Sequence, residues 1–170
     1  MQNILETERL LLREFVAADA PDLAWVLCDR ENMRFYRDPF DFPAVEAWIQ
    51  RNLLRYRDQG FGLWAVLLKP SNVFIGDCGL VPQIVDGDPE LEVAYHLNRL
   101  YQGCGFATEA ARACIEYAFA TLGRTRIISL IRPENTPSRR VAERNSLTVE
   151  KETLYVGLPH LVYVRHSPYA

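Results

Sequence analysis

The chain alternates short, mostly apolar stretches bounded by turn residues with longer segments whose apolar positions recur every three or four residues. The first pattern predicts strands and the second predicts helices. The predicted strands cover residues 8–15, 61–68, 73–81, 90–97, 126–131, 147–156 and 160–167. A loop of Asp86, Gly87, Asp88 and Pro89 is expected to separate the third strand from the fourth.

Four helices are predicted from the longer period and from end signals. They span 22–28, 43–58, 105–122 and 136–145. Asp19 is expected to cap the first, and Asn135 or Thr136 the last, while Gly60 and Gly123 end the second and third. Strands before, between and after helices indicate an α/β or α+β sheet with both faces covered.

Composition and charge narrow the class of protein. The 170 residues suit one domain, 1–170, with a full core; 49% are hydrophobic and 24% charged. A net charge of −3 argues against nucleic-acid binding driven by overall positive charge. The charged N-terminus is unlike a signal peptide, and no apolar run reaches the length of a membrane span, so a cytoplasmic protein without a membrane partner is expected.

The cysteines and histidines argue against a metal site. Cys28, Cys78, Cys104 and Cys114 lie far apart with no C-x-x-C pair. Such spacing is typical of reduced thiols in a cytosolic protein rather than of a disulfide framework or zinc site. With only three histidines as well, we expect no bound metal.

The segment 101–110, YQGCGFATEA, places two glycines directly before a predicted helix. Glycine leaves the backbone N–H groups open, and the helix start adds unpaired N–H groups and the positive end of the dipole, so the segment can bind a phosphate-like anion. The alternative is a turn that only lets the helix pack close to its strand. A Walker A loop requires Lys-Ser or Lys-Thr, and a Rossmann fingerprint requires a small residue where Thr108 stands; neither pattern fits.

Residues 102–107 match Q/R-x-x-G-x-G/A and thereby resemble the coenzyme A pyrophosphate loop of the GNAT acetyltransferase superfamily. Tyr101 and residues 108–110 extend the likeness toward its RimJ/RimL-type branch. Further segments are similar in the same order: 7–13, 75–80, 91–97 and 134–145. The resemblance implies a mixed, mostly antiparallel sheet of about seven strands, flanked by about four helices and splayed at a central parallel pair.

The resemblance also implies where acetyl-CoA lies, between strands 91–97 and 126–131. The implied diphosphate loop is Gln102, Gly103, Cys104, Gly105, Phe106, Ala107 and Thr108. The pantetheine is expected to pair with backbone near His96, Leu97 and Asn98. Asn135 and Ser138 are expected to reach the pantetheine and thioester, although both residues also suit an ordinary helix start.

Acetyl transfer to an amine needs a base, an oxyanion donor and a leaving thiolate. Glu92 is the candidate base: it shares one strand face with Ala94 and His96, and partial burial would raise its pKa. A solvent-facing Glu at the sheet edge is the alternative. The resemblance implies a backbone N–H near Leu97 or Asn98 as oxyanion donor. Ser138 is the expected proton donor, because Ala142 occupies the position of the tyrosine that many relatives use.

Taken together, these residues indicate an acetyl-CoA-dependent N-acetyltransferase that acts on a protein N-terminus or small primary amine by direct attack in a ternary complex. A non-catalytic CoA-binding module and an enzyme that uses another acyl group stay open. One reason is that Ser146 and Leu147 replace the Gly and Phe or Met usual in relatives. Cys104 could be a nucleophile at a helix start, but it falls on a variable loop position and is not expected to be one. The aromatic segment 30–42 and the loop 157–160 are expected to line the acceptor side, and a homodimer surface is left open.

Overall fold

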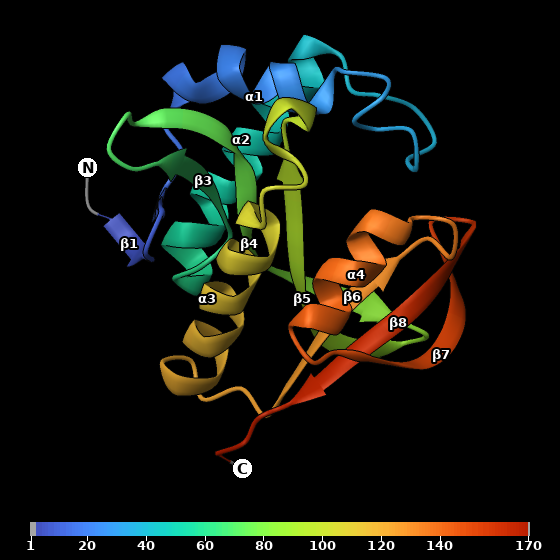
Figure 1. Cartoon of the computed structure of the whole chain (residues 1–170). Coiled ribbons are helices and arrows are strands. Elements are labelled where there is room, and N and C mark those ends of the chain that lie inside the picture. The colour runs from blue at the N-terminus through green and yellow to red at the C-terminus, as the bar shows by residue number, and fades with distance from the viewer. Residues whose placement is uncertain (1–2, 170) are drawn as a thin grey trace.

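One eight-stranded sheet organises the chain, in the order β1-β2-β3-β4-β5-β6-β8-β7 (Figure 1). It is seen in a computed structural model that describes residues 3–169. The strands are β1 (Asn3–Glu6), β2 (Leu10–Arg13), β3 (Leu63–Leu68), β4 (Val73–Val85), β5 (Asp88–Leu97), β6 (Arg126–Ile131), β7 (Thr148–Tyr155) and β8 (Leu158–His166). The α-helices are α1 (Ala20–Leu27), α2 (Phe42–Gln59), α3 (Phe106–Ala120) and α4 (Thr136–Arg144), and two 3-10 turns are η1 (Ala17–Asp19) and η2 (Arg99–Tyr101).

The expected class is confirmed: the sheet is antiparallel except for the pair β5–β6, and four α-helices flank it. Two differences concern the strands. The stretch predicted as 8–15 is the second strand of an N-terminal hairpin, which makes eight strands rather than about seven. The loop predicted at 86–89 is only a two-residue turn, because Asp86 and Gly87 both have positive φ (53° and 92°), which suits the twist of a tight hairpin.

The two faces of the sheet carry different helices. Along β4, the Asp77 side chain accepts a hydrogen bond from Trp48 of α2, whereas the sulfur of Cys78 lies 3.6 Å from that of Cys114 in α3. Neighbouring residues of a strand point to opposite faces, so α2 and α3 cover opposite faces. Figure 1 shows α3 and α4 in front of the sheet and α2 behind it. Among the described residues, no helix has both the length and the apolar character needed to cross a membrane.

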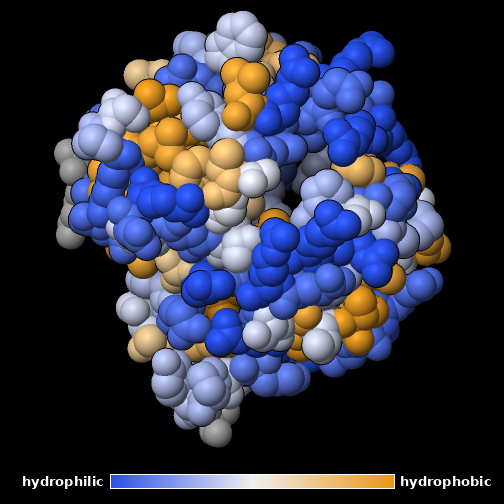
Figure 2. All heavy atoms as spheres, viewed as in Figure 1, coloured by the Kyte–Doolittle hydropathy of each residue, from blue (hydrophilic) through white to orange (hydrophobic). Residues whose placement is uncertain are grey.

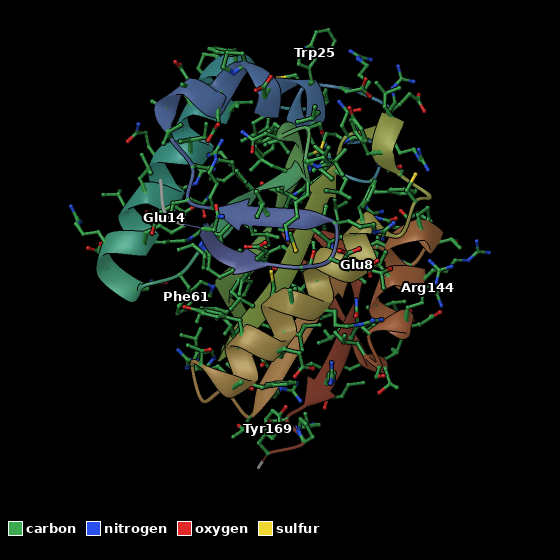
Figure 3. All side chains as sticks on the ribbon, turned by 60° about the vertical axis from the view of Figure 1, so that its left-hand side comes forward. Glu8, Glu14, Trp25, Phe61, Arg144 and Tyr169 are labelled. Carbon is green, nitrogen blue, oxygen red and sulfur yellow. The ribbon has the colours of Figure 1, made fainter. Side chains whose placement is uncertain are left out.

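Helix α1 buries the side chains predicted to face inward, Leu23, Val26 and Leu27. Trp25, which lies between them, points away from the molecule and is 74% exposed (Figure 3). Asp19 occupies the N-cap position of this helix as predicted, but its side chain makes no capping hydrogen bond. Its carboxylate instead accepts two hydrogen bonds of 2.8 Å from the Arg13 guanidinium, because a carboxylate this deeply buried requires an opposite charge.

Two other end signals behave as predicted, whereas α3 ends at Ala120 with Thr121 as its C-cap, ahead of the predicted end at Gly123. Gly60 ends α2 with φ of 80°, and the Asn135 side chain caps α4 by accepting from the N–H of Ser138 at 3.2 Å. Ser146 adopts φ of 62°, a left-handed conformation that glycine adopts readily and that strains a residue with a side chain.

Helix α2 is anchored to the sheet through a buried amide. Asn52 is fully buried; its Oδ1 accepts from the N–H of Leu63 at 2.9 Å, and its Nδ2 donates to the carbonyl of Trp48 at 3.0 Å. Asn52→Ala is expected to lower the free energy of unfolding by about 1–3 kcal/mol, because it leaves the buried N–H of Leu63 unpaired. Urea unfolding measures this loss. Gln50→Ala, at an exposed position of the same helix, should stay within about 0.5 kcal/mol of the parent; equal losses in the two variants would contradict the anchor.

Candidate active site

A cleft opens where β5 and β6 part. These parallel strands share one pair of opposite residues, Glu92 and Ile128. Beyond that pair lies a cavity of about 760 Å³, lined by β5, the segment 101–108, the end of β6 and the start of α4. Its volume is in the range usual for small-molecule sites. In the view of Figure 2, a central hollow rimmed mostly by hydrophilic residues marks where the surface is open.

The glycine segment forms one wall of this cavity. Gly103 and Gly105 have φ of 77° and 82°, and α3 begins immediately afterwards at Phe106. Gly105 occupies the N-cap and has no side chain to cap the helix, and the first backbone bond runs from Glu109 N–H to Gly105 O. The N–H groups of residues 106–108 therefore lack partners within the helix and meet the cavity, an arrangement that favours an anion.

Arg9, from the turn before β2, holds this loop in place. Its Nη1 donates to the carbonyl of Cys104 at 3.0 Å, its Nε donates to Glu109 at 2.7 Å, and its guanidinium lies 4.5 Å from the centre of the Phe106 ring. Thr7 completes the clamp by donating to the same carboxylate at 2.6 Å. Sequence reasoning assigned Arg9 no part in the site, since about one hundred residues separate it from the loop.

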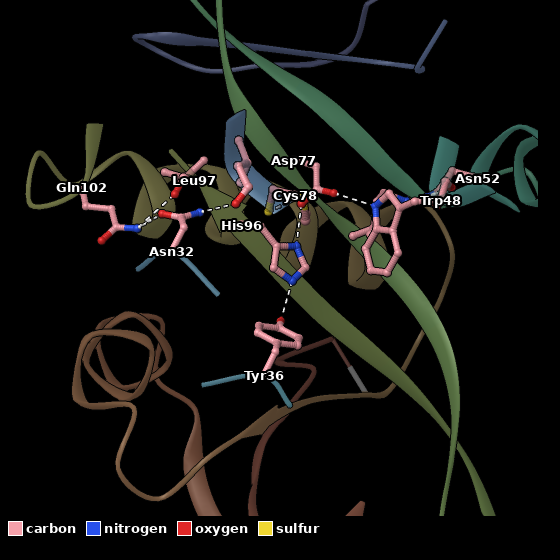
Figure 4. A network of polar contacts seen from close by, with 12 residues as sticks. Asn32, Tyr36, Trp48, Asn52, Asp77, Cys78, His96, Leu97 and Gln102 are labelled. Atoms are coloured by element: carbon pink, nitrogen blue, oxygen red, sulfur yellow. Dashed lines mark hydrogen bonds and ion pairs between the residues drawn. The ribbon is translucent and has the colours of Figure 1, made fainter. Parts of the chain in front are cut away.

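Gln102 braces the loop from the opposite side. Its side-chain nitrogen donates to the carbonyl of Leu97 and to Oδ1 of Asn32, both at 3.0 Å (Figure 4). The side chain thus joins the end of β5 to the segment between α1 and α2. The backbone N–H of Gln102 also donates to the carbonyl of Arg99 at 3.3 Å, so both parts of the residue hold the loop against the end of β5.

The backbone at the end of β5 is divided between the sheet and the cleft. The N–H of Asn98 donates to the carbonyl of Ile75 in β4 at 2.8 Å. Opposite residues of an antiparallel pair alternate between bonded and non-bonded, so His96 also points its N–H to β4, whereas Leu97 points its N–H to β6. Of the three backbone positions predicted to meet pantetheine, only Leu97 directs its N–H at the cleft. The N–H groups of His96 and Asn98 serve the sheet, and the pairing of pantetheine with the backbone near these residues stays a prediction.

Glu92 lies where the parallel strands part. Its residue is 8% exposed, so the alternative of a solvent-facing side chain is wrong. One oxygen accepts from the N–H of Leu130 at 3.2 Å and the other accepts from the Gln83 amide at 2.8 Å. Burial raises the pKa of Glu92 against the opposing effect of these two hydrogen bonds and of His96. The carboxylate therefore takes up a proton more readily than an ordinary glutamate.

Ser138, at the start of α4, lies on the other side of β5. Its hydroxyl donates to the Tyr95 hydroxyl at 3.1 Å, and the Tyr95 hydroxyl donates to the carbonyl of Ser138 at 2.9 Å. Ala142 is buried and contributes no hydroxyl. Tyr95, which sequence analysis assigned no role, thus places a phenol beside Ser138. Asn135 also lines the cavity, although its side-chain oxygen caps α4.

The aromatic segment before α2 covers the remaining side of the cavity. Phe35, Tyr36 and Phe40 line it, and Leu158 and His160 approach from the start of β8. Phe42 instead begins α2 at an exposed position. The Tyr36 hydroxyl lies 2.5 Å from Nε2 of His96. Sequence analysis expected the segment that contains Tyr36 to line the acceptor side but did not pair Tyr36 with His96, because nothing local joins residues 60 positions apart.

All four cysteines are free: Cys28, Cys78, Cys104 and Cys114. Cys104 is exposed on the loop, where its sulfur lies 3.7 Å from the carbonyl of Gln102. Within residues 3–169, no group of three or more His, Cys, Asp and Glu side chains is placed to hold a metal ion.

Comparisons with known proteins agree with this geometry. A family model described as an acetyltransferase (GNAT) domain matches residues 9–148. The uncharacterized N-acetyltransferase p20 of Bacillus licheniformis is 35% identical over 153 residues, which cover 88% of this chain and 84% of that protein. The crystal structure of an acetyltransferase from Agrobacterium tumefaciens str. C58 matches with a TM-score of 0.84 and 28% identity, covering 96% of this chain and 94% of the other. The ribosomal L7/L12 alpha-N-protein acetyltransferase RimL, solved in complex with coenzyme A, shares the fold with a TM-score of 0.77 at 19% identity, covering 99% of this chain and 100% of the other.

Proposed function

This chain belongs to the GNAT acetyltransferase family, and from that premise we propose that it transfers an acetyl group from acetyl-CoA to a primary amine by direct attack in a ternary complex. The observation that carries the proposal is one cavity with two ends. An uncapped helix start with two left-handed glycines lies at one end, and the buried carboxylate of Glu92 lies where β5 and β6 part. The acceptor is a protein N-terminus or a small amine.

In this proposal the diphosphate of acetyl-CoA lies on the N–H groups at the start of α3, held ready by the contacts of Arg9. The pantetheine follows the open edge of β5 toward Ser138 and Asn135. The coenzyme A in the RimL structure supports the same cosubstrate here, since the two folds agree. Gln102 keeps the loop and the strand end together rather than contacting the phosphates with its side chain.

Three groups divide the chemistry. Glu92 takes a proton from the amine, and its raised pKa improves its strength as a base. The N–H of Leu97, directed at the cleft, stabilises the oxyanion that forms when the amine attacks the thioester. The Ser138 hydroxyl, which donates to the Tyr95 oxygen in the free protein, turns to the departing thiolate and supplies a hydrogen bond or proton to the sulfur.

We infer further that residues 1–170 act as one acetyltransferase domain. Four free cysteines support a reducing compartment such as the cytoplasm. The proposal needs acetyl-CoA and an amine acceptor and no metal, membrane or nucleic acid; a homodimer stays open.

A non-catalytic CoA-binding module is the second candidate. Two observations favour it. The buried Ala142 offers no hydroxyl at the position where the sequence comparison expects a tyrosine. The Glu92 carboxylate accepts the backbone N–H of Leu130, which is a structural role. Under this reading the loop would bind CoA, and no amine would be acetylated.

Turnover and binding assays on the intact chain separate the two candidates. Acetyl-CoA at about one hundred times its Kd should stabilise the protein by about 2.7 kcal/mol and raise its Tm. CoA release should then depend on the acceptor in a panel of peptides with free N-termini, matched N-acetylated peptides and small primary amines. Stabilisation without turnover on any acceptor would favour the module, and no stabilisation would contradict both candidates.

A further inference from the structure

Four side chains from distant segments form a hydrogen-bonded series beside the cavity (Figure 4). Trp48 of α2 donates from Nε1 to one oxygen of Asp77 in β4 at 2.9 Å. The other oxygen of Asp77 lies 2.7 Å from Nδ1 of His96 in β5, and Nε2 of His96 lies 2.5 Å from the Tyr36 hydroxyl. Asp77 is completely buried and His96 is 9% exposed, whereas Tyr36 is 45% exposed and lines the cavity.

The hydrogen-bond chemistry gives this series a direction. A carboxylate only accepts hydrogen bonds, so Nδ1 of His96 carries the hydrogen that faces Asp77. In the neutral imidazole, Nε2 then accepts from the Tyr36 hydroxyl. The Tyr36 oxygen keeps lone pairs that can accept a hydrogen bond from a molecule in the cavity. A proton that arrives at Tyr36 can therefore pass to His96.

The surroundings of His96 favour that transfer. Burial lowers the pKa of His96, but the charge and hydrogen bond of Asp77 together with the charge of Glu92 outweigh burial, so the pKa is raised above 6.5. The groups that face His96 are Asp77 from β4, Glu92 from its own strand, and Trp48 and Tyr36, which are neutral near pH 7. Two carboxylates thus stabilise the imidazolium once it forms.

Amine acetylation requires two protons to leave the nitrogen. Amines with pKa values of about 7.7–8.0 for an N-terminus or about 10.4 for a lysine side chain are mainly protonated at neutral pH. One proton must leave to expose the lone pair, and a second leaves once the nitrogen has bonded to the acetyl carbon. Glu92 can take one of them. A second proton acceptor in the same cavity would serve the other.

We propose that Tyr36 is a catalytic residue that accepts the second proton and relays it to His96, with Asp77 and Trp48 as positioning residues. The relay rests on the proposed amine acetylation. The nitrogen forms its bond to the carbonyl carbon of the acetyl group, and the bond from that carbon to sulfur breaks, so the thiolate leaves with the electron pair. As the nitrogen gives a proton to the Tyr36 oxygen, the Tyr36 hydroxyl gives its own proton to Nε2 of His96. The imidazolium later releases that proton to water.

The test compares wild type, Tyr36→Phe and His96→Gln with one amine that the wild type acetylates, between about pH 5 and 9. The relay works only while His96 is neutral, so wild-type kcat/KM should fall as the pH drops through a pKa above 6.5. Tyr36→Phe should lower kcat by about 10–100-fold, leave acetyl-CoA affinity unchanged and remove this fall, so that the remaining acid limb lies at lower pH. His96→Gln should show the same loss of kcat and the same change in pH profile. If His96→Gln fails to fold, the result for Tyr36→Phe alone tests the relay.

Tyr117→Phe is the matched control, because it removes a phenol from α3 that packs on Trp64, away from the cavity. Its rate and pH profile should match the wild type. A Tyr36→Phe enzyme with wild-type rate, or with a lower rate and an unchanged pH profile, would overturn the relay and leave the proposed function standing. A wild type that acetylates no amine would overturn both.

Discussion

Glu92→Gln is expected to lower kcat/KM for the acceptor amine by about 10²–10⁴-fold, the usual contribution of a general base. Glutamine keeps the size of the side chain and can still accept the N–H of Leu130. It loses the ability to take a proton and the second oxygen that accepts from the Gln83 amide. Acetyl-CoA affinity should therefore stay close to wild type, and steady-state kinetics beside calorimetric titration would separate the two effects.

Glu90→Gln is the matched control for this change. Glu90 lies two residues earlier on β5, but its carboxylate pairs with Arg126 at 2.9 Å. Removing that charge should leave kcat/KM within about twofold of wild type. Equal losses in the two variants would point to the fold of β5 rather than to proton transfer.

The pH dependence gives a second measure of Glu92. The base must be ionised, and its pKa is raised above 4.5 mainly by burial. Activity that depends on Glu92 is complete above its pKa in the folded enzyme and is lost as the pH falls through it. In Glu92→Gln that contribution disappears, and the acid limb that remains should belong to His96. An aromatic amine, which is already neutral near pH 7, should suffer less from the substitution than an aliphatic one.

Gly105→Leu is expected to weaken acetyl-CoA binding by about 10–100-fold, the loss expected when one or two hydrogen bonds to a charged group fail. Gly105 has φ of 82° at the N-cap of α3, and the space beside it is open except for the Arg9 guanidinium, 3.4 Å from where a Cβ would lie. A leucine side chain there would occupy the approach of the diphosphate. Isothermal titration with acetyl-CoA measures the loss directly.

The substitution also strains the backbone, so its control must carry the same strain. Gly123 follows the C-terminal end of α3 with φ of 63°, and no atom lies within 4 Å of where its Cβ would be. Gly105→Leu and Gly123→Leu should each lose about 1–2 kcal/mol of stability, but only the first should lose affinity. Unchanged affinity in Gly105→Leu, or equal losses in both, would contradict the assignment of the loop.

The sequence pattern predicted those parts of the site whose conformation is set by residues close to them in the chain. The glycines before α3, the Asn135 cap and the strand 126–131 appear where they were predicted. The alternation along β5 correctly put Glu92 and His96 on one face, because successive side chains of a strand point to opposite sides. The Asp19 cap failed for a reason outside its own helix, since Arg13 offered the carboxylate a stronger partner.

What the sequence determined by itself is therefore the kinds of elements, their order and the loop that can receive an anion. These follow from periodicity and backbone freedom within about ten residues. The tertiary structure decided which side chains and backbone groups bind one another. Arg9 holds the loop, Glu92 accepts the N–H of Leu130, and Tyr95 lies beside Ser138. The hydrogen-bonded series from Trp48 to Tyr36 also forms only in the folded chain. Those contacts join residues that are far apart in the chain, and they form only because β5 and β6 part and leave polar groups that side chains from other elements must satisfy.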